Sequence, residues 1–220
     1  MRGEWRFHTA GEVIFGRGVV RRTGEVVRGL GAVRACLITD PGLISAGLHE
    51  PVLASRDEAG VEADLHDGGR PKPAVETVAA SAAALHGRGY EALVALGGGS
   101  NIDLAKAVAV LLRHGGEVED YIGEHKVPGP VLPLVAVSTT AGTGSEVSGA
   151  SVLADPARNR RGAILSNQLR PWAAIYDPLL TASCPPRVTA DAGIDALTHA
   201  VEAYLVADHR VESGPERPGL

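Results

Sequence analysis

The sequence predicts an α/β fold with a doubly wound, mostly parallel sheet, followed by the start of an all-helical segment. Three patterns support this prediction. Short apolar runs rich in β-branched residues alternate with stretches of helical periodicity as far as residue 137. Glycine or hydroxyl clusters follow two of these runs directly, at 97–100 and 138–146. A helical pattern that neither Gly nor Pro interrupts after Gly193 then covers 189–204.

The composition is typical of a folded protein and excludes several classes. Of the 220 residues, 45% are hydrophobic, which is enough for a sizeable core. The net charge of −5 and the lack of a long basic run argue against a nucleic-acid partner. No run is apolar for the length of a membrane span, and the N-terminus lacks the apolar segment of a secretory signal. Cys36 and Cys184 are expected to be reduced thiols of a cytoplasmic protein.

The N-terminal elements follow from apolar periodicity and its interruptions. A short strand is expected at 13–15, and apolar residues at helical spacing predict a helix over 19–30. Residues 33–39 (VRACLIT) are β-branched and mostly apolar, as expected for a strand covered on both faces. The Asp40–Pro41–Gly42 turn ends this strand, and a helical stretch continues to about residue 59.

The middle of the chain repeats the alternation. The next expected elements are a strand at 61–66, a loop at 67–73 (DGGRPKP), an alanine-rich helix at 74–86 and a strand at 92–96. They are followed by a helix over 101–113, a loop over 115–130 and a buried strand over 132–137. Strands that alternate with helices of this length favour a parallel sheet, because parallel neighbours need crossover connections.

Asp40 ends a predicted strand and has two interpretations of equal weight. A carboxylate in this position can accept hydrogen bonds from the ribose hydroxyls of a dinucleotide. It can also simply cap the following helix, with Pro41 at the first helical position. If Asp40 faces an adenosine ribose, its charge would repel a 2′-phosphate, which favours NAD over NADP.

Gly97, Gly98, Gly99 and Ser100 lie between a predicted strand and a predicted helix. Three glycines would let backbone N–H groups approach a pyrophosphate without obstruction by Cβ atoms, and Ser100 would cap the helix. The G-x-G-x-x-G pattern is absent, and a glycine turn without a ligand is the alternative of equal weight.

Two charged residues follow in the first turns of this helix. Asp103 suits the positive end of the helix dipole. Lys106 is expected to be in solvent.

Residues 138–146 (STTAGTGSE) form a second polar cluster directly after a predicted strand. Hydroxyls and free amides there can bind phosphate oxygens or a carboxamide, and a plain Ser/Thr/Gly loop is the alternative. Parallel strands end at the same edge of a sheet. This cluster and residues 97–100 therefore favour one ligand shared across that edge.

Asp195 and His199 are four positions apart in the helical pattern of 189–204. On a helix they lie on one face, one turn apart, where a carboxylate oxygen and an imidazole nitrogen can bind one divalent metal ion. The commoner explanation of an isolated pair of this kind is an Asp near the helix N-terminus and a His packed against a neighbour.

Four segments carry a family resemblance: FGRG at 15–18, GGGSNIDLAK at 97–106, STTAGTGSEVS at 138–148 and IYDPLLTASCPPRVTADAGIDALTHAVEAY at 175–204. Together they resemble the iron-containing (group III) alcohol dehydrogenases. This family belongs to the dehydroquinate synthase-like superfamily, with the glycerol dehydrogenases and maleylacetate reductases. The order and spacing of the motifs match over nearly the whole chain.

The resemblance implies a Rossmann-like NAD(P)-binding domain over 1–180 and the start of a helical metal-binding domain over 181–206. The implied cofactor residues are Asp40, Gly97, Gly98, Gly99, Ser100 and Asp103, with Thr139, Thr140, Thr143 and Gly144 on the nicotinamide side. Asp195 and His199 would be the first two ligands of Fe²⁺, or of Zn²⁺ as a substitute, and Asp195 disfavours a maleylacetate reductase. The metal would act as a Lewis acid on the alkoxide from which hydride leaves for the nicotinamide.

Two departures from the family pattern stand out. Arg161 occupies the position of a lysine near the cofactor ribose, and it keeps the charge without the compact ammonium. The family has two further metal-ligating histidines downstream, and His209 matches neither. Residues 207–220 are polar and rich in Pro and Gly, which predicts a disordered tail. We therefore expect a C-terminally truncated or frameshifted member that departs from the family at about His209.

Several functions follow from these expectations. The first is a metal-dependent alcohol dehydrogenase that moves hydride between an alcohol and NAD(P), impaired here because two ligands make an incomplete site. The second is a remnant that binds NAD(H) without chemistry. Glycerol dehydrogenase-like and maleylacetate reductase-like oxidoreductases are alternatives, and a dehydroquinate synthase-like lyase fits the motifs less well. The partner would be a small alcohol or carbonyl compound, and the family implies a homo-oligomer.

Overall fold

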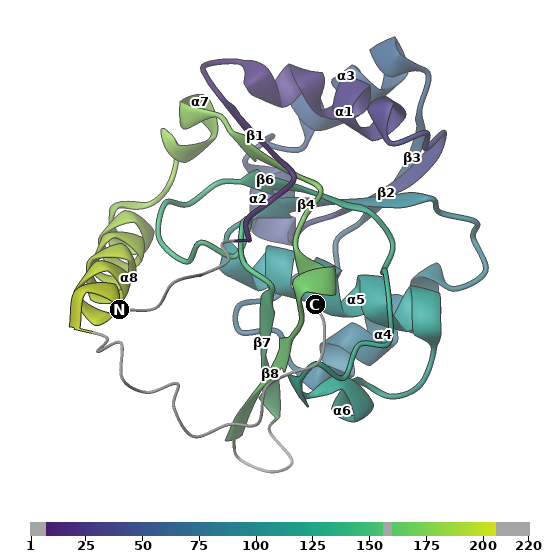
Figure 1. Cartoon of the computed structure of the whole chain (residues 1–220). Coiled ribbons are helices and arrows are strands. Elements are labelled where there is room, and N and C mark those ends of the chain that lie inside the picture. The colour runs from purple at the N-terminus through teal and green to yellow at the C-terminus, as the bar shows by residue number, and fades with distance from the viewer. Residues whose placement is uncertain (1–7, 156–159, 206–220) are drawn as a thin grey trace, which may run out of the picture.

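The computed structural model describes residues 8–155 and 160–205, which form two sheets with helices packed around the larger one (Figure 1). The elements, in chain order, are β1 (Glu12–Phe15), η1 (Val19–Arg22), α1 (Thr23–Gly29), β2 (Arg34–Ile38), α2 (Pro41–Ser45), α3 (Glu50–Ala59), β3 (Glu62–His66), α4 (Val75–Leu85), β4 (Ala92–Gly97), α5 (Gly99–His114), α6 (Val118–Tyr121), β5 (Gly123–Glu124), β6 (Leu134–Ser138), β7 (Ala150–Asp155), β8 (Arg160–Leu165), η3 (Asn167–Leu169), β9 (Ala173–Tyr176), α7 (Pro178–Thr181) and α8 (Pro186–Leu205).

The larger sheet has six strands in the order β1-β9-β6-β4-β2-β3, and every pair of neighbours is parallel. The chain runs outward from β2 to β3, returns to β4 and then continues to β6 and β9. The direction of winding therefore reverses between β2 and β4. The predicted doubly wound α/β fold is confirmed, and ligands of such sheets bind beyond the carboxyl ends of strands at this reversal.

Helices cover both faces of this sheet (Figure 1), and an apolar core lies between the sheet and the helices on each face. On one face, α4 and α5 pack against side chains such as Ile38 and Leu93. On the other face, η1, α1 and α3 pack against the alternate residues, such as Leu37 and Val94. Successive strand residues point to opposite faces, so a strand covered on both sides must be apolar throughout. This explains the continuous apolar runs of β2, β4 and β6.

Some elements differ from those expected. The helical stretch after Asp40 is two helices, α2 and α3, because Gly47 adopts a left-handed φ of 72° between them. The expected loop 115–130 contains α6, where Glu117 and Asp120 form a reciprocal capping box. It also contains β5, which joins β8 and β7 in a three-stranded sheet that the sequence patterns did not reveal.

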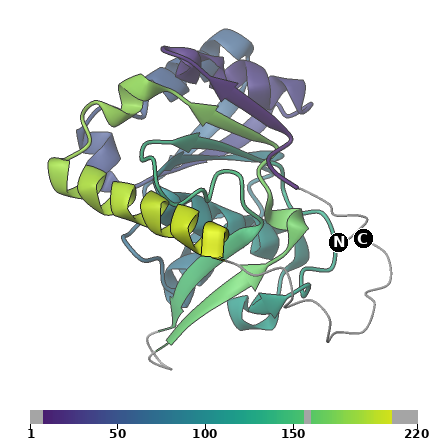
Figure 2. The same ribbon diagram turned by 60° about the vertical axis from the view of Figure 1, so that its left-hand side comes forward.

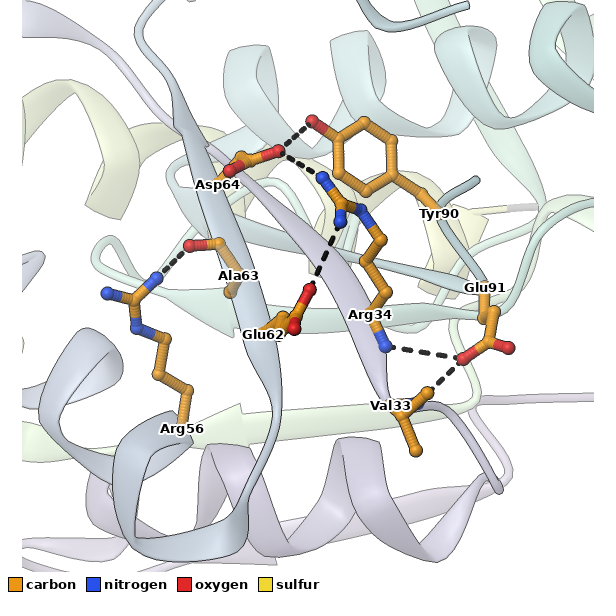
Figure 3. Close-up of polar contacts among 8 residues, drawn as sticks. All are labelled: Val33, Arg34, Arg56, Glu62, Ala63, Asp64, Tyr90 and Glu91. Carbon is orange, nitrogen blue, oxygen red and sulfur yellow. Dashed lines mark hydrogen bonds and ion pairs between the residues drawn. The ribbon is translucent and has the colours of Figure 1, made fainter. Parts of the chain in front are cut away.

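A polar cluster holds together the starts of β2, β3 and β4, at the edge of the sheet opposite their carboxyl ends (Figure 3). Arg34 contacts Glu62 at 3.1 Å and Asp64 at 3.3 Å. The Tyr90 hydroxyl donates a 2.6 Å hydrogen bond to Asp64 and, as the main cause, lowers the pKa of that carboxyl group. Glu91 accepts hydrogen bonds from the backbone N–H of Arg34 and of the residue before it.

Helix α8 lies at the side of the molecule, outside the layers of the sheet and its helices (Figures 1 and 2). Apolar side chains along it remain exposed, among them Ile194, Leu197 and Tyr204. It lies close to the sheet domain at Gly142, where an added Cβ would be 2.5 Å from the carbonyl oxygen of Ala192. None of the helices in the described part of the chain is long and apolar enough to cross a membrane.

Candidate functional site

The carboxyl ends of β2, β4 and β6 lie side by side. Ile38 is in register with Ala95, and Gly97 is in register with Ser138. The segments that follow these strands therefore meet at one edge of the sheet, as the sequence predicts for residues 97–100 and 138–146.

The glycine segment after β4 begins the longest helix of the sheet domain. Helix α5 starts at Gly99, two residues earlier than expected, and Gly98 is its N-cap. The prediction that Ser100 caps the helix is therefore wrong: its Oγ accepts a 3.3 Å hydrogen bond from the backbone N–H of Lys72 instead. Among the described residues, no side chain caps α5. Its first N–H groups are therefore available to an anion, which the helix dipole also favours.

The two polar loops are in direct contact through these glycines. A Cβ added at Gly98 would lie 2.9 Å from Thr140 Oγ1, and one added at Gly99 would lie 2.7 Å from Thr143 Cγ2. The loops also share a backbone hydrogen bond of 3.1 Å from the Thr139 N–H to the Gly97 carbonyl. A side chain at 98 or 99 would therefore push against Thr140 or Thr143, and glycine lets the loops approach each other.

Of the two interpretations of Asp40, the structure confirms the helix cap, and the contact with a ribose stays a prediction. Its Oδ1 accepts hydrogen bonds from the N–H groups of Gly42 at 2.8 Å and Leu43 at 3.1 Å, so it does cap α2. Its Oδ2 accepts a 2.7 Å hydrogen bond from Asn101 Nδ2. Asn101 is nearly buried and also donates to the Leu96 carbonyl, so it fixes the carboxylate against the start of α5. Sequence patterns gave no role to Asn101, because its partner is 61 positions away.

A third segment, residues 67–73, reaches the same edge and was expected only to be a loop. Its Gly69 N–H donates a 2.9 Å hydrogen bond to the Thr39 carbonyl at the end of β2. A Cβ at Gly69 would lie 2.6 Å from that carbonyl oxygen, so only glycine fits there. The signal that could have revealed this segment is the same as at 97–99, namely glycines that directly follow a predicted strand.

The remaining cofactor candidates lie in and beyond residues 139–144, which we call the threonine loop. Gly144 has a left-handed φ of 64°, which favours glycine. Thr143 Oγ1 accepts a 3.2 Å hydrogen bond from the Ser145 N–H, which makes a tight turn within the loop. Arg161 is exposed on β8, opposite Ala154 of β7.

Asp103 and Lys106 do not face solvent, and for Lys106 the expectation was wrong. Burial raises the pKa of Asp103 and lowers the pKa of Lys106 to about 8. Asp103 Oδ1 accepts a 2.5 Å hydrogen bond from Ser145 Oγ, and Oδ2 accepts one of 3.1 Å from the Val152 N–H. Lys106 is fully buried beneath the same segment. Both residues therefore fasten the threonine loop to α5.

The expected metal ligands lie on one face of α8. His199 Nε2 is 3.9 Å from Asp195 Oδ1, and the two side chains are 52% and 43% exposed. Within residues 8–155 and 160–205, no group of three His, Cys, Asp or Glu side chains could hold a metal ion. A catalytic zinc site normally has three protein ligands. These residues alone therefore do not fit a catalytic metal site. His209 and the predicted tail at 207–220 lie outside the described residues.

The residues at the carboxyl edge do fit a dinucleotide. The start of a 16-residue helix offers uncapped N–H groups for phosphate, and a carboxylate lies at the end of the neighbouring strand. Thr39, also at that strand end, is fully buried, and its Oγ1 has no partner among the described residues. On the far side of the glycines lie the hydroxyls of Thr140 and Thr143.

Comparisons with known proteins agree with this fold. Residues 10–178 match the family model of iron-containing alcohol dehydrogenases. The chain is 38% identical over 192 residues to the NAD-dependent methanol dehydrogenase of Bacillus methanolicus, covering 87% of this chain and 50% of that protein. It is 41% identical to the choline dehydrogenase of Bacillus subtilis, and this match covers 87% of this chain and 48% of that protein. The chain thus spans about half the length of the curated relatives it matches.

Solved structures show the same similarity. A 1,3-propanediol oxidoreductase superimposes with a TM-score of 0.87 at 36% identity, covering 91% of this chain and 53% of that one. The sulfoacetaldehyde reductase of Bifidobacterium kashiwanohense, solved in complex with NAD⁺, superimposes with a TM-score of 0.85 at 32% identity, with the same coverage. The parallel six-stranded sheet matches the N-terminal Rossmann-like domain of such enzymes. On this evidence, the chain belongs to the iron-containing alcohol dehydrogenase family.

Proposed function

We propose that this chain binds NAD(H) across the carboxyl edge of its six-stranded sheet. The observation that carries the proposal is the contact between the two loops, in which Gly98 and Gly99 lie against Thr140 and Thr143. This contact joins an anion-binding helix start to a row of hydroxyls at the place where the winding of the sheet reverses. The NAD⁺ complex of the sulfoacetaldehyde reductase, a structural relative, is consistent with this ligand.

In the proposed arrangement each part of the edge binds one part of the cofactor. Asp40 would accept hydrogen bonds from the adenosine ribose, and Asn101 would hold its carboxylate in place. The first N–H groups of α5, with Ser100, would bind the pyrophosphate. Thr139, Thr140, Thr143 and Gly144 would line the nicotinamide side, with Arg161 near its ribose. The negative charge of Asp40 favours NAD over NADP, because a 2′-phosphate would be repelled.

We further propose that the reaction is hydride transfer between a small alcohol and its aldehyde or ketone. Bound NAD⁺ supplies the hydride acceptor. The relatives include enzymes named as methanol, choline and 1,3-propanediol dehydrogenases, and these named substrates are small hydroxyl compounds. In the proposed domain division, 1–180 binds the cofactor, and 181–206 begins a helical domain in which Asp195 and His199 would bind Fe²⁺ or Zn²⁺. Further ligands are needed to complete this metal site.

A second candidate is an NAD(H)-binding protein without dehydrogenase chemistry. The two-ligand pair on α8 favours it, because Asp195 and His199 are half-exposed and lack a third ligand in the described chain. A metal held by two side chains would be bound weakly and would leave no ordered position for a substrate.

Two measurements with the 220-residue chain test these proposals. Titration of NADH, followed by nicotinamide fluorescence, is expected to saturate, and a linear response up to millimolar NADH would refute both candidates. Alcohol-dependent formation of NADH is then assayed with Fe²⁺ or Zn²⁺ added, beside a full-length relative as the positive control. Turnover supports the dehydrogenase, whereas saturable binding without turnover at the same protein concentration supports the binding protein.

A further inference from the structure

The ammonium group of Lys106 occupies an unusual position for a lysine. The side chain has no exposed surface. Its Nζ donates hydrogen bonds to three backbone carbonyls, those of Ser145 at 2.6 Å, Ser148 at 2.8 Å and Ala150 at 2.8 Å. An ammonium has three N–H donors, and these carbonyls are its shortest contacts; the hydroxyls of Ser145 and Ser148 lie further away, at 3.3 Å. All three acceptors belong to one stretch of six residues, 145–150.

The electrostatic surroundings show why this lysine needs its partners. Burial lowers the pKa of Lys106 to about 8, and the nearby carboxylates of Asp103 and Glu146 oppose that shift. A buried charge is strongly unfavourable unless hydrogen bonds replace its water. The three carbonyls replace that water, and a second cation, Arg170, donates a 2.7 Å hydrogen bond to the Val147 carbonyl of the same segment. The segment and the ammonium therefore stabilise each other.

Asp103 lies one turn earlier on the same side of α5 and holds the same segment from its two ends. Its Oδ1 accepts from Ser145 Oγ, its Oδ2 accepts from the Val152 N–H, and its backbone carbonyl accepts from Ser151 Oγ at 2.8 Å. Residues 145–152 are thus fastened to α5 at both ends by Asp103 and in the middle by Lys106. The threonine loop is therefore anchored at Thr139 by β6 and at Ser145 by α5.

This anchoring links the two halves of the candidate site through a single helix. The N-terminus of α5 is the glycine segment, and its side holds the segment that follows the threonines. The threonines also contact the glycines directly. A change at Lys106 would therefore displace Thr140 and Thr143 while leaving the first turn of α5 and Asp40 in place.

We propose that Lys106 is a positioning residue for the nicotinamide half of the cofactor site, acting through residues 145–150 on the threonine loop. The inference rests on the proposed NAD(H) function of this edge. It assigns Lys106 no contact with the cofactor. A change at Lys106 should therefore affect NADH and ADP-ribose differently. The whole dinucleotide uses the threonine loop, whereas ADP-ribose uses only Asp40 and the start of α5.

The experiment compares NADH and ADP-ribose as probes of the same chain. Lys106→Met keeps the length of the side chain but removes its charge and donors. Lys126→Met is the matched control, because Lys126 is exposed on the loop after β5. Affinities come from NADH fluorescence and from calorimetry with ADP-ribose. Hydrogen exchange of the amides at 143–150, measured without ligand, reports directly on the anchored segment.

We expect Lys106→Met to weaken NADH binding about tenfold or more, since three buried or partly buried carbonyls lose a charged donor. ADP-ribose affinity should stay within about twofold of wild type, and amides 143–150 should exchange faster. A general loss of structure would weaken the binding of both NADH and ADP-ribose. A loss of NADH affinity alone therefore distinguishes a positioning role from a role in folding. Equal NADH affinity in Lys106→Met and wild type would overturn the inference. Failure of the wild type to bind either probe would instead overturn the proposed function.

A second variant keeps the test decisive if Lys106→Met does not fold. Ser145→Ala removes the hydroxyl that bonds to Asp103 and leaves every carbonyl acceptor in place. It should weaken NADH binding about threefold, by loosening one end of the segment, without a change for ADP-ribose. Wild-type affinity for both probes in Ser145→Ala, together with faster exchange at 143–150, would show that the anchoring of this segment does not position the loop.

Discussion

Replacement of Gly99 by alanine is the sharpest test of the contact between the two loops. The added Cβ would lie 2.7 Å from Thr143 Cγ2, 2.8 Å from its Oγ1 and 3.0 Å from its Cβ. Carbon atoms in good contact are about 3.5 Å apart, so one loop must move by roughly 0.8 Å. Gly99 lies inside the closely packed start of α5, where overpacking costs about 1–3 kcal/mol of the free energy of unfolding.

The assay is thermal and urea unfolding combined with NADH titration. A loss of about 2 kcal/mol corresponds to a fall in Tm of roughly 4–8 °C for a chain of this size. Thr143→Ala removes the two closest atoms, so the double variant Gly99→Ala/Thr143→Ala should regain at least about half of the lost stability. NADH affinity should fall in Gly99→Ala, because the cofactor would bind at the junction that has moved.

Gly29→Ala is the matched control. Gly29 is exposed near the end of α1, and an added Cβ meets nothing within 4 Å. Alanine there should leave stability unchanged or raise it by up to about 1 kcal/mol, because alanine favours a helix. If Gly99→Ala were as stable as Gly29→Ala and did not respond to Thr143→Ala, the two loops would not be in the contact described, and the basis of the proposed cofactor site would fail.

Three further predictions concern other parts of the molecule. Asn101→Ala should lower the free energy of unfolding by about 1–3 kcal/mol, because the buried Leu96 carbonyl loses a donor, and ADP-ribose should bind more weakly. Unchanged ADP-ribose affinity would contradict the role of Asn101 in holding the carboxylate of Asp40. Tyr90→Phe should cost at most about 1 kcal/mol in urea unfolding at pH 7, since Asp64 is 45% exposed. The pKa of Asp64 is lower in the folded chain than its ordinary value of 3.8, so the stabilisation by the Tyr90–Asp64 hydrogen bond is present above pH 3.8 and is lost as the pH falls through the folded pKa. A difference in stability between Tyr90→Phe and wild type that persists at pH 2 would contradict this reasoning. His199→Ala should change unfolding by less than about 0.5 kcal/mol while weakening Zn²⁺ binding in calorimetry, and unaltered Zn²⁺ affinity would argue against its role as a ligand.

The sequence predicts five strands of the larger sheet but not β9. The central strands are the clearest, because a strand covered on both faces must be apolar at every position. Residues 33–39 and 92–96 show this pattern, and the structure places β2 and β4 there. The meeting of residues 97–100 and 138–146 was predictable for a topological reason. Once the strands are parallel neighbours, their carboxyl ends must share an edge.

The partners of polar side chains were not predictable in the same way. Lys106 resembles any lysine on the second turn of a helix, and its burial depends on carbonyls about 40 positions further along the chain. Carbonyl groups leave no trace in side-chain identity, so no pattern in the sequence marks them as acceptors. The division between α2 and α3 depends similarly on the backbone conformation of Gly47, which a run of helix-forming residues around it conceals.

The pairing of β1 with β9 bears on how the chain folds as it is made. The first strand has no neighbour in the sheet except β9, and the nearby hydrogen bond from the Val20 N–H to Asp177 joins positions 157 residues apart. Contacts of such long sequence separation form late. While the ribosome is still adding β9, β1 carries exposed Val13 and Phe15 with unpaired backbone groups on both sides. That interval is when a nascent chain of this topology most needs a chaperone.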